Sequence, residues 1–214
     1  MIVGVLGFMS SGKGTVGEIL AEEMGFVPLS FAGSLKDAVS AIFGWDRSLL
    51  EGDTKESREF RETPDPFWTK KFYDESKFGD SIIQITPRYI LQQFGTEVCR
   101  NNLLDSIWVD SLERKILQYE NVVITDVRFN NEIEFLKGLG STLIQVNRDI
   151  SMPYWYDIYS IEDTEYFEDY ANKQGIHRSE YEWLGNPNID HIIENNGSFR
   201  DLELRVFDII SNNK

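Results

Sequence analysis

The sequence is poor in the residues from which disulfides and zinc sites are built. It contains one cysteine, Cys99, and two histidines, His177 and His191. One cysteine excludes a disulfide within the chain and suits a reducing compartment, so we expect a cytoplasmic protein. The same scarcity argues against a zinc site, which needs several cysteine or histidine ligands.

Long apolar runs and positive charge are also scarce. No run reaches the length of a membrane span and no signal peptide precedes residue 7, so we expect no membrane partner. Lys and Arg number 21 against 36 Asp and Glu, and the net charge of −15 argues against a nucleic-acid partner. A small polyanion would have to bind where basic residues gather locally. No Ser/His/Asp or Cys/His pattern indicates a covalent nucleophile.

A glycine-bracketed loop, Gly7-Phe-Met-Ser-Ser-Gly-Lys-Gly-Thr15, lies between an apolar run and an amphipathic segment. This order predicts a phosphate-binding loop, because glycines let the amides turn toward one centre and a helix N-terminus is positive. A plain β–α turn would not explain a lysine at the helix start. The predicted polyphosphate contacts are Gly7, Ser10, Ser11, Gly12, Lys13, Gly14 and Thr15. Gly14 follows the lysine, so the usual hydroxyl is displaced to Thr15. This Lys-Gly-Thr order resembles nucleoside monophosphate kinases more than motor ATPases or GTPases.

Apolar runs alternate with helical patterns along the rest of the chain. Strands are predicted at 2–6, 27–32, 121–125, 142–146 and 189–194, and helices at about 16–24, 34–43, 86–98, 103–118 and 132–139. Ser34 and Thr86-Pro87 are predicted to cap helices, and Ser198 with Asp201 to cap a last one. This alternation predicts an α/β fold with helices on both faces of a parallel sheet, the three-layer arrangement of P-loop NTPases.

We predict one domain over residues 1–214, with its core at 1–46, 86–148 and 186–214. Two polar excursions interrupt this core. The first, at about 47–85, is polar and irregular and is predicted to be an acceptor-binding insertion. The second, at about 149–185, is rich in tyrosine and acid and is a candidate lid that would exclude water.

Asp126 follows a short buried strand, at the edge where parallel sheets bind ligands. Together with the Thr15 hydroxyl it is our candidate for binding Mg²⁺, and a helix-capping role is the alternative. Val127 stands where motor ATPases usually place a water-activating glutamate, so work driven by hydrolysis is disfavoured.

Phosphoryl transfer needs cations that neutralise donor, acceptor and transition state. The candidate catalytic residues are Lys13, Asp126, Arg128 and Arg178. The candidate substrate-binding residues are Lys36, Arg58, Arg61, Trp68, Arg88 and Arg100. Structural alternatives stay open: a surface ion pair for any single arginine, a salt-bridged helix for Arg58 and Arg61, and an anchor for the insertion in the case of Trp68.

Four segments make the chain resemble the deoxynucleoside monophosphate kinases of bacteriophages over most of its length. They are Gly7–Thr15, Leu50–Trp68 with its Glu-Gly-x-Thr-x-Glu-Ser-Arg core, Thr86–Arg100 and Asp126–Glu132. The tail at 190–206 is similar to the end of dephospho-CoA kinases, where the Asn-Asn-Gly loop lies near the adenine of ATP. That likeness adds Asn196 and Gly197 to the candidate ATP contacts.

The resemblance implies an adenylate-kinase-like fold and transfer of the γ-phosphoryl group of ATP, with Mg²⁺, to a deoxynucleoside 5′-monophosphate. It implies that residues 12–15 hold ATP, that Asp126 serves the metal, and that Arg178 belongs to the lid. Arg88, Arg128 and either Arg58 or Arg61 would face the acceptor phosphate. A homodimer and a phage origin, hence the host cytoplasm, are compatible with it.

Two alternatives stay open. One is a P-loop kinase of another small acceptor, such as dephospho-CoA. The other is a nucleotide-binding switch or assembly factor that has no acceptor.

Overall fold

The structure is a computed structural model that describes residues 1–75, 84–161 and 164–212. The chain forms two compact units, one of Met1–Ser30 with Glu113–Lys214 and one of Phe31–Leu112. The predicted insertion and the predicted lid each include residues outside the described part, at 76–83 and at 162–163.

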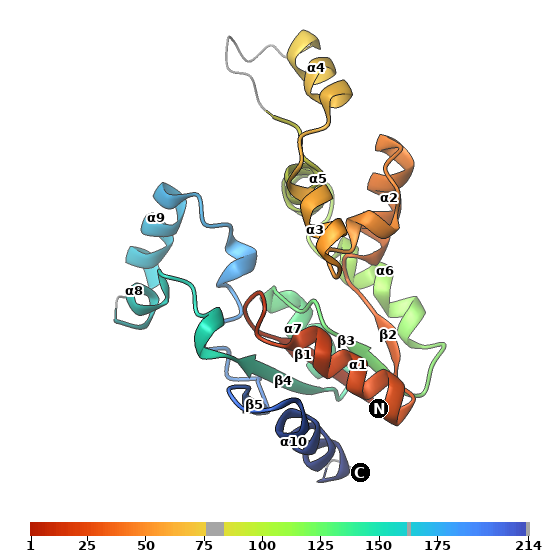
Figure 1. Ribbon diagram of the computed structural model, residues 1–214, viewed down its shortest axis with the longest axis vertical. Coiled ribbons are helices and arrows are strands. Elements are labelled where there is room, and N and C mark those ends of the chain that lie inside the picture. Colours follow the sequence, from red (N-terminus) through yellow and green to blue (C-terminus); the bar gives the residue numbers. More distant parts are fainter. Residues whose placement is uncertain (76–83, 162–163, 213–214) are drawn as a thin grey trace. The chain divides into compact units, whose positions relative to one another are not determined.

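The first unit is built around a parallel sheet with the strand order β2-β3-β1-β4-β5 (Figure 1). Its strands are β1 (Ile2–Leu6), β2 (Val27–Leu29), β3 (Val122–Ile124), β4 (Thr142–Asn147) and β5 (His191–Glu194). In the central strand β1, Gly4 pairs with Ile124 on one side and with Leu143 on the other. The predicted parallel α/β sheet is confirmed.

Helices cover both faces of this sheet (Figure 1). α1 (Lys13–Met24) and α10 (Phe199–Asn212) pack on the face that carries Val3 and Val5. α7 (Asn130–Gly138) packs on the other face, where side chains alternate to the opposite side of β1. A Cβ at Gly4 would lie 2.5 Å from Leu143 Cδ2 and 2.9 Å from Leu136 Cδ1, so glycine permits the close contact with α7.

The segment at 149–185 belongs to the same unit. It contains η3 (Asp149–Ser151), α8 (Tyr156–Ile161), α9 (Thr164–Gln174) and η4 (Arg178–Glu180). The buried ring of Phe167 lies 5.4 Å from Trp155, 5.1 Å from Tyr159 and 5.1 Å from Tyr181, measured between ring centroids. These aromatic contacts give the tyrosine-rich excursion a small core of its own.

The second unit is helical. It contains α2 (Gly33–Phe43), η1 (Ser48–Leu50), α3 (Lys55–Glu62), α4 (Pro66–Glu75), α5 (Pro87–Gln92) and the π-helix η2 (Gln93–Arg100), and α6 (Ile107–Ile116) begins within it. A Cβ at Gly95 would lie 2.7 Å from Leu35 Cδ2, so η2 and α2 pack closely there. The indole of Trp108 donates to the Gly95 carbonyl at 2.9 Å. The helical unit thus spans residues 31–112, which is more of the chain than the predicted insertion at 47–85.

Two local predictions are wrong. The stretch 47–85 is not irregular, because η1, α3 and α4 occupy much of it. The overlooked signal is Thr54, whose hydroxyl accepts from the Ser57 amide at 3.1 Å and caps α3. Ser34 does not cap α2, which begins one residue earlier with Ala32 at its N-cap. Its hydroxyl accepts from Ser111 Oγ at 2.6 Å instead.

Two other predicted caps are confirmed. Thr86 Oγ1 accepts from the Tyr89 amide at 3.1 Å, with Pro87 in the first turn of α5. The Ser198 hydroxyl accepts from the Asp201 amide at 3.2 Å, and the Asp201 carboxylate accepts from the Ser198 amide at 2.8 Å.

Candidate functional site

The loop between β1 and α1 has the backbone that the sequence pattern predicts. Gly7 and Gly12 have φ of 145° and 109°, which L side chains rarely adopt. A Cβ at Gly7 would lie 2.3 Å from the Val146 carbonyl oxygen, and one at Gly12 would lie 2.3 Å from Asn195 Nδ2. Ser10, with φ of 66°, is the non-glycine residue with positive φ in the part of the chain that the structure describes. The loop therefore requires glycine at both ends.

These two positions give a prediction with an internal control. Gly7→Ala should lower the free energy of unfolding by about 1–3 kcal/mol, because the new Cβ meets backbone atoms of β4 at a strained φ. Gly14→Ala should raise it by about 0.5–1 kcal/mol, since Gly14 lies in α1 with open space around it. Urea unfolding of both variants measures the difference, and a shift of the same sign in both would contradict the geometry.

Lys13 begins α1 and turns back over the loop. Its Nζ donates to the carbonyls of Gly7 and Phe8, both at 2.6 Å. Burial, and then the positive charge of Arg128, lower the pKa of Lys13 from 10.5 to about 8, while Glu180 and Asp126 oppose the shift. The ammonium is thus partly desolvated beside a second cation, and an anion bound to the loop would stabilise it.

The hydroxyls of the loop differ in their surroundings. Ser11 is fully buried, and its Oγ has no hydrogen-bond partner among the residues that the structure describes. Thr15 is half-buried in the first turn of α1, and Ser10 is exposed. A buried hydroxyl without a partner is uncommon in proteins, and this one lies within the glycine-bracketed loop itself.

Asp126 lies at the carboxyl edge of the sheet, just after β3. Its Oδ2 accepts a hydrogen bond from Ser30 Oγ at 2.7 Å, and Ser30 follows the neighbouring strand β2. Asp126 is also one of the acids that raise the pKa of Lys13. Asp126 and Lys13 therefore lie in one group of charges, together with Ser30, which the sequence pattern did not reveal.

Arg128 lies in the same group of charges. Its Nη1 donates to Glu180 Oε1 at 3.0 Å, and Glu180 comes from η4 in the segment at 149–185. Both residues act on the pKa of Lys13, in opposite directions. The backbone here is fixed by the buried carboxylate of Glu132, which accepts from the amides of Arg128 at 2.8 Å and Phe129 at 3.1 Å. Composition gave no signal for Glu180.

Arg178 packs beside this turn. Its guanidinium lies 5.4 Å from the centre of the Phe129 ring, and its Nε donates to Glu182 Oε2 at 2.6 Å. Glu182 Oε1 in turn accepts from the Asn130 amide at 3.0 Å. Residues 178–182 are therefore tied to the start of α7, in the same unit as Lys13.

The loop after β5 also contacts the loop between β1 and α1. The contact is made by Asn195, which precedes the predicted residues Asn196 and Gly197. Asn195 Nδ2 donates to the Ser11 carbonyl at 2.8 Å. The predicted Asn196 accepts instead from the Asp149 amide at 2.9 Å, and Gly197 lies close to Asp201.

The predicted substrate-binding residues all lie in the second unit. Lys36 Nζ pairs with Glu51 Oε2 at 2.5 Å, and Arg88 pairs with Glu62. Arg58 Nη2 donates to the Asp53 carbonyl at 2.6 Å, and Arg61 Nη1 donates to the Glu51 carbonyl at 3.2 Å. Both arginines therefore bind carbonyls of the turn at 51–53. The salt-bridged helix that we considered as an alternative does not include these contacts.

Two further candidates are more enclosed. Trp68 Nε1 donates to the Phe43 carbonyl at 2.9 Å, and the two rings lie 4.7 Å apart. These contacts favour the anchoring alternative for Trp68. Arg100 is buried in η2, with 6% of its surface exposed.

The residues at the carboxyl edge of the sheet fit a polyphosphate and a hard cation. Gly7 and Gly12 hold the loop at φ values that favour glycine, the Lys13 ammonium is buried beside Arg128, and the Ser11 hydroxyl is buried. Among the described residues no group of three or more His, Cys, Asp or Glu could hold a metal by itself. A cation here would thus be shared between few protein oxygens and the ligand, as Mg²⁺ commonly is with nucleotides.

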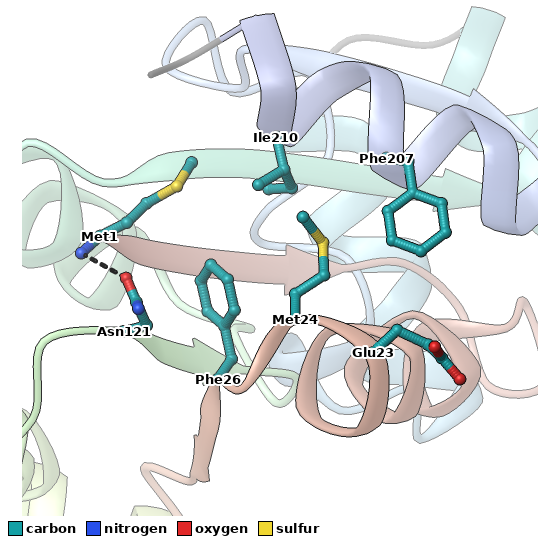
Figure 2. Close-up of a pocket in the computed structure, with 7 residues that line it drawn as sticks. All are labelled: Met1, Glu23, Met24, Phe26, Asn121, Phe207 and Ile210. Atoms are coloured by element: carbon teal, nitrogen blue, oxygen red, sulfur yellow. Dashed lines mark hydrogen bonds between the residues drawn. The ribbon is translucent and has the colours of Figure 1, made fainter.

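A separate pocket of about 500 Å³ lies elsewhere in the first unit (Figure 2). It is lined by Met1, Glu23, Met24, Phe26, Asn121, Phe207 and Ile210. The Met1 ammonium donates to Asn121 Oδ1 at 3.2 Å, where β1 begins. Lys13 follows the opposite end of β1, so this pocket is not part of the candidate site.

Comparisons with known proteins agree on one family. A profile described as deoxynucleotide monophosphate kinase matches residues 69–206. A protein of Acanthamoeba polyphaga mimivirus that bears the name of a deoxynucleotide monophosphate kinase is 34% identical over 163 residues, which are 69% of this chain and 74% of that protein.

Solved structures show more distant likenesses. Shikimate kinase from Aquifex aeolicus aligns over 100% of this chain and 98% of its own, with 13% identity and a TM-score of 0.49. Dephospho-CoA kinase from Campylobacter jejuni aligns over 98% and 95%, with 16% identity and a TM-score of 0.43. Likenesses this weak do not bear on the substrate. No helix in the described part of the chain is long and apolar enough to span a membrane.

Proposed function

The chain belongs to the deoxynucleotide monophosphate kinase family, and from that premise we propose that it moves the γ-phosphoryl group of ATP to a deoxynucleoside 5′-monophosphate, with Mg²⁺. The observation that carries this proposal is the position of Lys13, folded over a glycine loop beside Asp126 and Arg128. A buried lysine at a helix start is suited to bind the phosphates of a donor nucleotide.

The donor site would consist of the loop and its neighbour after β5. Gly7, Gly12 and Gly14 leave the backbone amides accessible, and Lys13 would contact the β- and γ-phosphates. Ser10, Ser11, Thr15, Asn196 and Gly197 complete the proposed contacts. Asn195 supports them through its hydrogen bond to the Ser11 carbonyl.

Thr15 and Asp126 would hold Mg²⁺ together with the nucleotide. The ion, when bound, supplies neutralisation of the phosphate charge. Ser30 orients the Asp126 carboxylate through its 2.7 Å hydrogen bond, so it is expected to support this role from the neighbouring strand.

We propose direct in-line transfer between the two nucleotides. Arg128 and Arg178 would neutralise charge that develops on the transferred group, and water would be excluded by the segment at 149–185. No enzyme nucleophile is needed for such a step. Arg128 would contribute the larger effect, because it lies close enough to Lys13 to shift its pKa.

The acceptor would be bound by residues of the second unit. Lys36, Arg58, Arg61, Arg88 and Arg100 are the proposed contacts, with Trp68 as an anchor for the helices that carry them. Glu51 and Glu62, the acids that pair with Lys36 and Arg88, would exchange places with an acceptor phosphate.

A substrate panel tests the proposal. ADP release would be measured with ATP and each common deoxynucleoside monophosphate in turn, with dephospho-CoA, and with no acceptor. Stimulation by one or more deoxynucleoside monophosphates is expected. Stimulation by dephospho-CoA alone would establish the other kinase, and slow hydrolysis that no acceptor changes would establish a nucleotide-dependent switch.

The pKa of Lys13 predicts how ATP binding depends on pH. Below about pH 8 the lysine is charged and attracts the phosphates, and above it the neutral amine does not. The apparent affinity for ATP should therefore fall as the pH rises from 7 to 9. Titration of the protein with an ATP analogue across this range measures it, and an affinity that stays constant to pH 10 would contradict the lowered pKa.

A further inference from the structure

The second residue of the phosphate loop, Phe8, differs from its neighbours. Its side chain is buried, with 4% of the residue exposed, whereas the next residue, Met9, is 68% exposed. A loop that binds a polyphosphate needs small residues and free amides, so a buried aromatic ring within it calls for a separate explanation.

The ring of Phe8 packs against three aromatic side chains of the segment at 149–185. Its centroid lies 5.7 Å from Trp155, 5.6 Å from Tyr156 and 5.1 Å from Trp183. Trp155 and Tyr156 stand at the start of α8, and Trp183 follows η4. Phe8 thus contacts both ends of the segment, with the edge-on geometry that favours specific placement.

The backbone of Phe8 contacts the reactive part of the loop. Its carbonyl accepts from Lys13 Nζ at 2.6 Å and from the Ser11 amide at 3.2 Å. The packing of the Phe8 ring therefore holds the Phe8 carbonyl in place, and this carbonyl in turn holds the Lys13 ammonium. The same segment carries Glu180, the partner of Arg128, so Phe8 contacts a segment that also contributes to the charged group around Lys13.

We propose that Phe8 is a positioning residue that joins the phosphate loop to the segment at 149–185, so that Lys13 and η4 keep a fixed relation during phosphoryl transfer. This inference rests on the proposed function, in which ATP binds the loop. It also gives the segment a second role beside water exclusion: it supports the loop that binds the donor.

Matched substitutions separate positioning from stability. Phe8→Leu removes the loop's own ring, which packs on the segment at 149–185. Phe167→Leu makes the same change within that segment, at a ring that packs on Trp155 and Tyr181. Both should lower the melting temperature. Phe8→Leu should raise the KM for ATP about tenfold or more, with a smaller change in the KM of the acceptor, whereas Phe167→Leu should leave both KM values within about twofold.

The dissociation constant of an ATP analogue is measured in parallel, because it needs no acceptor. If the analogue binds but no acceptor is phosphorylated, the proposed kinase function is wrong. The role of Phe8 is still tested in that case, by comparing the dissociation constants of the two variants. Hydrogen exchange of the wild-type protein provides a measurement without substitution: the analogue should protect residues 153–160 and 181–184 together with the loop. Equal losses of ATP affinity in both variants, or protection of the loop alone, would overturn the inference.

Discussion

Lys13→Met should abolish phosphoryl transfer while leaving the protein at least as stable as the wild type. The substitution keeps an unbranched chain of similar length but removes the ammonium that would contact the donor phosphates. Such a charge contributes on the order of several kcal/mol in the transition state, so turnover should fall by a factor of about 10³ or more. Single-turnover ADP formation at saturating ATP measures the loss.

The expected stability follows from the sign of the pKa shift. The folded protein lowers the pKa of Lys13 from 10.5 to about 8. At pH 7 the amine is charged in both states, but the charge has a higher free energy in the folded protein than in the unfolded chain, which lowers stability. That cost, at most about 3 kcal/mol, is present below pH 8 and disappears as the pH rises toward 10.5. Loss of the two hydrogen bonds to Gly7 and Phe8 offsets part of the gain in Lys13→Met.

Lys137→Met is the matched control. Lys137 makes a partly exposed ion pair with Asp190 at 2.8 Å, far along the chain from the loop. Its loss should cost about 0–1 kcal/mol of stability and leave turnover unchanged. Near-wild-type turnover in Lys13→Met, or an equal loss in Lys137→Met, would refute the assignment of the loop.

The parts of this fold that the sequence predicts correctly are those that local residues determine. Gly7 and Gly12 have backbone angles that few other residues adopt, and short apolar runs that alternate with helical segments are typical of a buried parallel sheet. The place of Asp126 at the carboxyl edge of the sheet was predictable because it directly follows an apolar strand, but the pairing of that strand with β1 came from the structure.

The parts that the sequence did not reveal depend on contacts between distant residues. Glu180 belongs to an acidic excursion, and only its pairing with Arg128, 52 residues away, distinguishes it from its neighbours. Phe8 looks like any apolar residue until the rings of Trp155 and Trp183 lie against it. Periodicity and spacing carry no information on such contacts, since they describe one segment at a time.

The second unit illustrates a different failure. The polar composition of 47–85 suggested irregular chain, yet α3 and α4 form there with little buried apolar surface. They are stabilised by local polar contacts, such as the Thr54 cap and the arginines at 58 and 61 that bind the carbonyls of the turn at 51–53. A pattern search for apolar periodicity overlooks helices of this kind.

Arg128→Ala should lower kcat by a factor of about 10²–10³ with little change in stability. The pair with Glu180 is partly exposed, at 44% and 36% of the two side chains, so its loss should cost no more than about 1 kcal/mol. A guanidinium that neutralises charge in the transition state contributes far more to the rate than this pair contributes to folding. Steady-state kinetics with both nucleotides saturating, together with thermal unfolding, measure the two effects.

Two controls decide whether the guanidinium or the ion pair matters. Glu180→Gln keeps the shape of the partner but removes its charge, so kcat should stay within a few-fold of the wild type if Arg128 acts on phosphate. Arg200→Ala removes an exposed arginine that pairs with Glu203 in α10, and it should change neither kcat nor stability. Equal losses in Arg128→Ala and Glu180→Gln would mean that the pair, by holding η4 beside Lys13, is what transfer requires, and the role proposed for Arg128 would be wrong.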